Sequence, residues 1–169
     1  MGGGRLTPWL TAYLALGSNL GDRLDHLREA ALNLAGMAGV RVVAASAIYR
    51  TEPVGPADQP DYANQVLRVE TALPPEALLA AAITTERRAG RTRERPDGPR
   101  TLDVDLLFFG EEIIARQQLV VPHPRLHRRR FVLVPMAELD PDFVHPVLKR
   151  TMAELLATLA DPHRVAPWS

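Results

Sequence analysis

Cysteine is absent from this chain of 169 residues. Without it the protein can form neither a disulfide framework nor a thiolate metal site, a composition that fits an intracellular protein. An excess of one charge is also missing, because 20 basic side chains balance 20 acidic ones. A neutral chain offers no general electrostatic reason to bind nucleic acid or an anionic membrane, so any anion site must be local.

Long apolar runs are missing as well. The opening stretch, MGGGRLTPWLTAYLALGSN, has one arginine and an apolar run too short for a signal peptide or a spanning helix. We therefore expect a cytoplasmic protein that binds neither membrane nor nucleic acid, and we expect a monomer.

The common glycine-rich and nucleophile motifs do not occur. The chain has no Gly-Lys dipeptide, and hence no Walker loop, and neither G-x-G-x-x-G nor G-x-S-x-G is present. GSNLGD (17–22) could hold an anion at the start of a helix. Capping of that helix by Ser18 or Asn19 is the simpler interpretation.

The length and the 46% hydrophobic content predict a single domain over 1–169, with residues 1–10 as a flexible extension. Apolar periodicity and turn residues predict an alternation of strands and helices. Strands are expected over 11–17, 40–51, 62–71 and 101–110, and helices within 18–37, 73–90 and 151–160. Residues 111–130 are expected to form a short hairpin arm and a loop that enters a helix near Pro124. This βαββαβ order resembles the ferredoxin-like α+β fold, with helices on one face of the sheet and extra elements at the C-terminus.

Two aspartates interrupt the apolar strand in GPRTLDVDLLFFG (98–110). Alternate side chains of a strand share a face, so the carboxylates of Asp103 and Asp105 lie side by side. Two like charges on one partly apolar surface require a cation. Arg91, Arg93, Arg95 and Arg100 precede them, and arginine matches phosphate oxygens. We therefore predict a magnesium and phosphate site; a solvated edge strand with arginines paired to nearby glutamates is the alternative.

A second basic stretch, VVPHPRLHRRRFVLVP, covers 120–135. His123 and His127 are four residues apart, but the prolines on either side of His123 favour a loop over a helical zinc pair. The neighbouring arginines predict another anion-binding surface, or else a merely solvated basic turn.

Four blocks occur in order: YLALGSNLGDR, YRTEPVGPADQPDYANQV, ERRAGRTRE with GPRTLDVDLLFFG, and VPHPRLHRRRFVLVP. Together they resemble 6-hydroxymethyl-7,8-dihydropterin pyrophosphokinase of folate biosynthesis, over residues 12 to about 140. The resemblance implies a ferredoxin-like enzyme that transfers pyrophosphate from ATP to the pterin hydroxymethyl group and releases AMP. It also implies two magnesium ions between these small-molecule substrates.

Carried over by position, the resemblance makes Asp103 and Asp105 the magnesium ligands. It places the pterin between Tyr62 and Phe131, with Asn64, Thr51 and the backbone near Val54 at its polar edge. The residues implied for the phosphates and the nucleotide are Arg91, Arg93, Arg100, Glu86, Leu106, His123 and Arg129, of which Arg91, Arg93 and Arg100 are the catalytic set. One departure is Pro96-Asp97, where family members commonly carry Arg-Trp.

Two other classes of protein fit parts of the pattern. A ferredoxin-like RNA-binding module would share the fold, but it needs exposed aromatic residues on the central strands and gives no role to D-x-D. A two-metal phosphodiesterase would share the carboxylates without needing Tyr62, Phe131 and Asn64.

Overall fold

The computed structural model describes residues 8–90 and 99–169, and the βαββαβ order expected from the sequence is present in it, followed by a C-terminal part. Strands and helices begin and end as follows: β1 (Leu10–Ser18), α1 (Arg23–Ala35), β2 (Val40–Ala45), β3 (Tyr49–Thr51), β4 (Tyr62–Thr71), α2 (Pro75–Arg88), β5 (Asp103–Phe109), β6 (Ile114–Arg116), β7 (Leu119–Val121), a 3₁₀ turn (Leu126–Arg128), α3 (Arg130–Leu139), α4 (Met152–Ala157) and β8 (Val165–Pro167).

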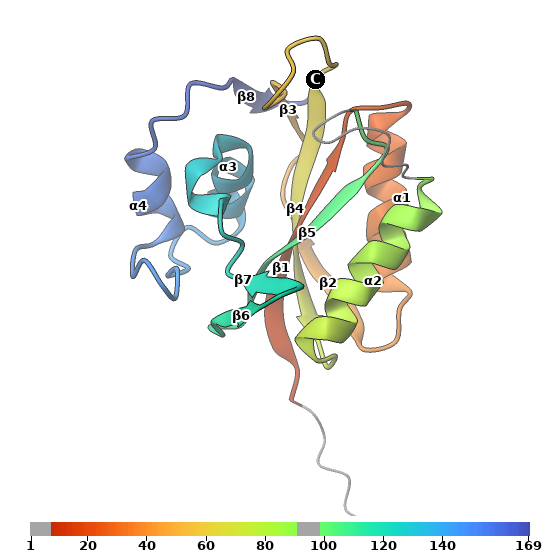
Figure 1. Ribbon diagram of the computed structural model, residues 1–169, viewed down its shortest axis with the longest axis vertical. Coiled ribbons are helices and arrows are strands. Elements are labelled where there is room, and N and C mark those ends of the chain that lie inside the picture. The colour runs from red at the N-terminus through yellow and green to blue at the C-terminus, as the bar shows by residue number, and fades with distance from the viewer. Residues whose placement is uncertain (1–7, 91–98) are drawn as a thin grey trace, which may run out of the picture.

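The main sheet is antiparallel, with strand order β5-β1-β4-β3-β8 and with β2 also paired to β4 (Figure 1). The strand predicted over 40–51 is divided into β2 and β3. Ser46 lies at the division, where its N–H donates to the carbonyl of Val66 and its hydroxyl accepts from the Val66 N–H. The Ser46 hydroxyl thus takes the place of a backbone carbonyl as the acceptor for the Val66 N–H. The pairing with β4 can therefore pass from β2 to β3 while the backbone of Val66 stays hydrogen-bonded.

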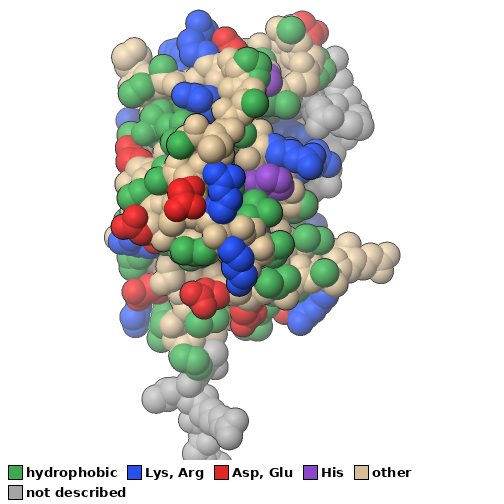
Figure 2. Space-filling view, turned by 90° about the vertical axis from the view of Figure 1, so that its left-hand side faces the viewer, with side chains coloured by type: hydrophobic (Ala, Val, Ile, Leu, Met, Phe, Trp, Pro, Cys, Tyr) green, Lys and Arg blue, Asp and Glu red, His purple; other side chains and the backbone are tan. Residues whose placement is uncertain are grey.

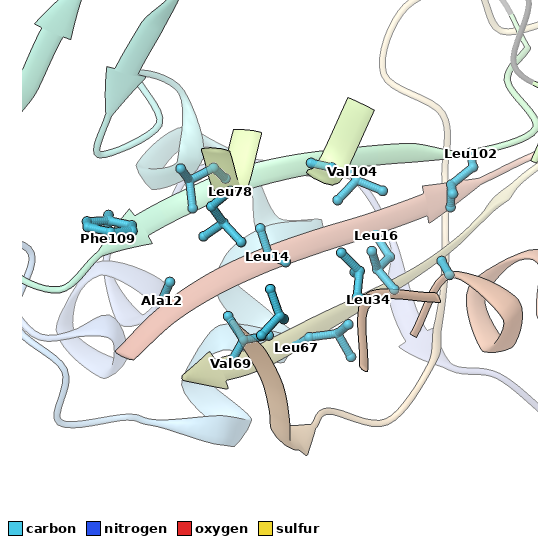
Figure 3. Close-up of a cluster of buried hydrophobic side chains, with 14 of the residues drawn as sticks. Ala12, Leu14, Leu16, Leu34, Leu67, Val69, Leu78, Leu102, Val104 and Phe109 are labelled. Atoms are coloured by element: carbon cyan, nitrogen blue, oxygen red, sulfur yellow. The ribbon is translucent and has the colours of Figure 1, made fainter. Parts of the chain in front are cut away.

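Helices α1 and α2 cover one face of the sheet, as expected for the βαββαβ unit (Figure 1). Leu14 and Leu16 of β1 point to this face and pack with Leu34 of α1 and Leu78 of α2 (Figure 3). Leucine and alanine at helical spacing form the buried side of each helix, which is why the sequence pattern located both helices.

The C-terminal helices cover the opposite face of the sheet. Tyr13 of β1 and Phe108 of β5 point that way and pack with Leu133 of α3 and Met152 of α4. The sheet is therefore covered on both faces, with a separate apolar cluster on each. None of the helices in the described part of the chain has both the length and the apolar content needed to cross a membrane.

Several boundaries differ from the sequence predictions. Leu10, expected in the extension, pairs with Thr71 as the first residue of β1, while residues 1–7 lie outside the described part. Helix α1 is capped by the Asp22 carboxylate rather than by Ser18 or Asn19. The helix expected near Pro124 begins at Arg130, because the extended backbone of Arg129 ends the preceding 3₁₀ turn.

Candidate active site

A pocket opens on the α3 side of the sheet, where β1 runs between β4 and β5. Gly17 of β1 is paired there with Asn64 of β4 and with Asp103 of β5. The pocket is lined by Ala15, Leu16, Gly17, Thr51, Glu52, Val54, Gly55, Tyr62, Asn64, Arg100, Asp103, Asp105, Arg125, Arg129 and Phe131. Five separate segments of the chain, 15–17, 51–55, 62–64, 100–105 and 125–131, therefore meet at this end of the sheet.

The floor of the pocket depends on glycine at position 17. A Cβ atom there would lie 2.7 Å from the Asn64 side-chain oxygen, closer than real Cβ contacts. The absence of a side chain leaves room for the Asn64 amide oxygen beside Gly17 of β1, while the Asn64 Nδ2 donates to the hydroxyl of Thr51 on β3. Thr51 and Asn64 are both buried, so this part of the pocket presents fixed polar groups.

Asp103 and Asp105 form the acidic wall of the pocket, on one face of β5. The Arg100 guanidinium donates to Asp103 at 2.6 Å. Burial, together with the nearby charges of Asp103 and Glu86, raises the pKa of Asp105 to about 6. At neutral pH the ionised Asp105 carboxylate is therefore energetically unfavourable, and a bound cation would stabilise it.

Three arginines of the described chain line the pocket together with these carboxylates: Arg100, Arg125 and Arg129. Burial lowers the pKa of the Arg129 guanidinium, and Asp105 partly opposes the shift. An arginine keeps its charge at any ordinary pH, so the basic wall stays cationic. A pocket with acidic and basic walls can hold metal-bound phosphate groups between them.

Tyr62 and Phe131 bring aromatic rings to the same pocket from different elements. Tyr62 opens β4, and Phe131 lies in the first turn of α3. Thr51, Val54 and Asn64 line the pocket with them, so the five residues expected to bind the pterin lie together.

Comparison with known proteins supplies the family. Residues 13–141 match the family described as 7,8-dihydro-6-hydroxymethylpterin-pyrophosphokinase (HPPK). The chain belongs to the HPPK family.

Curated relatives agree with this assignment. The 2-amino-4-hydroxy-6-hydroxymethyldihydropteridine pyrophosphokinase of Haemophilus influenzae is 41% identical over 152 residues, which are 90% of this chain and 94% of that protein. The protein of the same name from Bacillus subtilis is 48% identical over 128 residues, 76% of this chain and 77% of that protein.

The fold also matches solved HPPK structures. A crystal structure of a Plasmodium falciparum HPPK-DHPS triple mutant aligns with a TM-score of 0.70 at 16% identity. The alignment covers 89% of this chain and 43% of that longer protein, so the chain spans less than half of it. At this identity the likeness concerns the fold, and it supports the ferredoxin-like arrangement expected from the sequence.

Three other residues expected at the HPPK nucleotide site, Glu86, Leu106 and His123, are described and lie outside the pocket lining. Glu86 is buried on α2, and its Oε1 accepts from the Val104 N–H at 3.0 Å. Leu106 is buried in the cluster beneath α1 and α2. Arg91 and Arg93 lie outside the described residues, and their roles stay predictions.

His123 has an environment that favours its neutral form. Burial and the charges of Arg129 and Arg125 lower its pKa to about 4. Its Nδ1 accepts the Arg125 backbone N–H at 3.2 Å, which leaves the ring proton on Nε2. The histidine is therefore an uncharged donor beside the basic wall. His127 lies elsewhere, with its ring 6.3 Å from that of His145.

Asn19 was missed as a site residue in the sequence. Its backbone N–H donates to the Arg100 carbonyl at 3.1 Å, and its side-chain oxygen accepts the Arg100 N–H at 2.8 Å. Its Nδ2 donates to Gln59 of the loop over 52–61 at 3.0 Å. Asn19 thus holds Arg100 and this loop in place. The GSN sequence at the end of β1 was the only signal, and helix capping explained it equally well.

Proposed function

We propose that this pocket is where the chain performs the reaction of its family. The chain transfers pyrophosphate from ATP to the hydroxymethyl group of 6-hydroxymethyl-7,8-dihydropterin, giving the pterin diphosphate and AMP in folate biosynthesis. The observation that carries the site assignment is one pocket lined by an aromatic pair, two carboxylates and three arginines. That combination suits a flat heterocycle beside a polyphosphate.

The pterin occupies the part of the pocket between Tyr62 and Phe131. Rings on both sides of a flat heterocycle provide stacking and buried area. The Asn64 amide, fixed by its hydrogen bond to Thr51, reads the polar edge of the pterin. A fixed amide favours the pterin over other flat heterocycles, because a heterocycle with a different pattern of donors and acceptors would leave the buried amide without a hydrogen-bond partner.

Asp103 and Asp105 hold magnesium together with the phosphate oxygens of ATP. Among the described side chains no three His, Asp or Glu groups gather as a complete metal site. Two carboxylates completed by substrate oxygens and water are a common magnesium arrangement. A cation at this position would offset the burial and the neighbouring negative charges that raise the pKa of Asp105. Two magnesium ions, as the resemblance implies, would neutralise the phosphates and align the attacking and leaving oxygens.

The residues of the chain contribute positioning and charge. Arg100, Arg125 and Arg129 bind phosphate oxygens and stabilise the charge that moves to the leaving AMP, while Arg91 and Arg93 extend the same cationic set. The aromatic pair holds the pterin hydroxyl in line with the β-phosphorus. Phosphoryl-type transfer of this kind needs no protein nucleophile.

The covered sheet argues against an RNA-binding module. Such modules use exposed aromatic residues on the open sheet face, whereas α3 and α4 cover that face here (Figure 1). Basic, acidic and apolar side chains are interspersed over the surface on this side of the molecule (Figure 2).

Phosphorus NMR of a reaction mixture tests the proposal. ATP, magnesium and hydroxymethyl-dihydropterin should give resonances of AMP and of a pterin diphosphate. ADP with a pterin monophosphate, or pyrophosphate released into solution, would contradict it and point to a kinase or a phosphodiesterase.

A further inference from the structure

The β8 segment, defined here as residues 161–168, follows α4 and runs past the N-terminal end of α3 to pair with β3 (Figure 1). None of its residues lines the pocket. Its hydrogen bonds nevertheless reach both walls of the part assigned to the pterin.

The first contact is with the wall that carries Phe131. Helix α3 has no side-chain cap of its own, and Asp161 replaces it. One carboxylate oxygen of Asp161 accepts the Arg130 N–H at 3.0 Å, and the other accepts the His163 N–H at 3.0 Å and contacts the His163 ring. Arg130 lies between Arg129 and Phe131, so the cap fixes the turn that brings both side chains to the pocket.

The second contact is with the wall formed by β3 and the loop after it. The Glu52 N–H donates to the Arg164 carbonyl at 3.1 Å. In return, the Glu52 carboxylate accepts the Arg164 N–H at 3.1 Å and lies 3.7 Å from the guanidinium. Glu52 lines the pocket next to Thr51, so β8 fixes the backbone beside the pterin's polar edge.

The third contact, made by Trp168, joins the start of α1 to the wall formed by β3 and the loop after it. The Trp168 N–H donates to the Ile48 carbonyl at 2.8 Å, and the Arg50 guanidinium lies 4.0 Å from the Trp168 ring centroid. Arg23 lies 4.7 Å from the same ring, and its guanidinium donates to the Asp61 carbonyl at 2.7 Å. Asp61 precedes Tyr62, so Trp168 supports the second aromatic residue as well.

We propose that the β8 segment is a positioning element for the pterin, which sets the separation between Phe131 and the wall of Thr51 and Tyr62. Asp161 and Trp168 act as positioning residues, and neither touches the substrate. The inference rests on the pterin site proposed above. Loss of either contact leaves Asp103, Asp105 and Arg100 in place. It loosens the spacing between Phe131 and the wall of Thr51 and Tyr62, which raises the cost of ordering these residues around the pterin.

The test is titration calorimetry with 6-hydroxymethyl-7,8-dihydropterin in the presence of magnesium and α,β-methylene-ATP, in which the reacting bond cannot break. Asp161→Ala and Trp168→Ala should each weaken pterin binding about fivefold, from the loss of one cap or one ring contact. Trp168→Ala should leave the affinity for α,β-methylene-ATP alone within about twofold of the parent value, because the contacts of Trp168 lie away from the carboxylates and from Arg129. Asp161→Ala also loosens the turn that carries Arg129, so it should weaken nucleotide binding, but by less than it weakens pterin binding.

Conservative variants separate positioning from general damage. Asp161→Asn keeps an acceptor for the Arg130 N–H, and Trp168→Phe keeps a ring between the two arginines, so both should retain most of the pterin affinity. If Trp168→Ala fails to fold, the comparison of Asp161→Ala with Asp161→Asn tests the positioning role on its own. Arg28→Ala, which removes an exposed ion pair with Asp25 on α1, is the control and should change neither affinity.

Phe131→Ala, measured in parallel, distinguishes this inference from the proposed site. If Phe131→Ala weakens pterin binding while Asp161→Ala and Trp168→Ala do not, the positioning role is overturned and the site stands. Equal losses for pterin and nucleotide would mean that the segment only stabilises the fold. If Phe131→Ala has no effect, the pterin site itself is wrong, and the inference fails with it.

Discussion

The Glu86 carboxylate on α2 accepts the backbone N–H of Val104, the residue between Asp103 and Asp105, at 3.0 Å. Among the described strands β5 lies at the edge of the main sheet, and its outer side is packed against α2. Glu86 therefore supplies the hydrogen bond that a neighbouring strand would otherwise provide, and it holds the D-x-D backbone in register.

Substitution of Glu86 should separate its hydrogen bond from its charge. Glu86→Ala leaves a buried N–H without this acceptor, so we expect the free energy of unfolding to fall by about 1–3 kcal/mol. Glu86→Gln keeps an acceptor and should lose less than half as much. Urea denaturation at pH 7 measures both. Equal losses would show that the charge, rather than the hydrogen bond, provides the stabilisation.

Asp103→Asn and Asp105→Asn should each lower kcat about 100-fold or more, because a magnesium ligand is lost where the charge of the moving group must be neutralised. Steady-state assays at saturating magnesium measure this, with circular dichroism as the check on folding. A kcat within about threefold of the parent would contradict the metal assignment.

The two variants should differ in thermal stability without ligands at pH 8. The pKa of Asp105 is raised in the folded protein, so its ionisation above pH 6 costs stability that the neutral amide would restore. Asp105→Asn should therefore melt at a higher temperature than the parent. Asp103→Asn should show no such gain, because it removes the charged partner of Arg100.

Arg125 lines the pocket, whereas Arg128 in the same turn does not. Arg125→Ala should raise the KM for ATP about tenfold, from the loss of one charge-assisted hydrogen bond to a phosphate. Arg128→Ala, which removes the same charge a few residues away, should change this KM by less than about twofold. Equal effects would mean that the turn acts only through its overall charge.

Asp161 should contribute stability that depends on pH. Burial alone would raise its pKa, but hydrogen bonds from the Arg130 and His163 backbones and the His163 ring lower it below the ordinary value of 3.8. Its contribution is therefore present above pH 3.8 and is lost as the pH falls through the lowered pKa. Melting curves of the parent and Asp161→Ala should differ at pH 6 and converge toward pH 2. A constant difference would contradict the cap.

Local sequence patterns predicted the strands and helices whose buried face is a regular series of apolar side chains, such as β1 and α1. They did not predict β8, because three residues that include Pro167 carry no strand signal and their pairing depends on β3 far along the chain. The division of 40–51 into two strands was also missed, since it depends on how Ser46 meets Val66.

The D-x-D motif singled out both aspartates, and the family resemblance singled out the aromatic pair; all four residues line the pocket. Asn19 and Glu52 were missed because their roles arise from tertiary contacts. Arg125 was predicted only as one of several neighbouring arginines of an anion-binding surface. Nothing in the local sequence says that Asn19 pairs with Arg100, or that Arg125 faces the pocket while Arg128 does not.

The central claim is tested most directly by the release of AMP from ATP with and without 6-hydroxymethyl-7,8-dihydropterin, in the presence and absence of magnesium. We predict AMP formation only when the pterin and the metal are both present, with one pterin diphosphate formed for each AMP. AMP released at the same rate without the pterin, or no AMP in the complete mixture, would contradict the account.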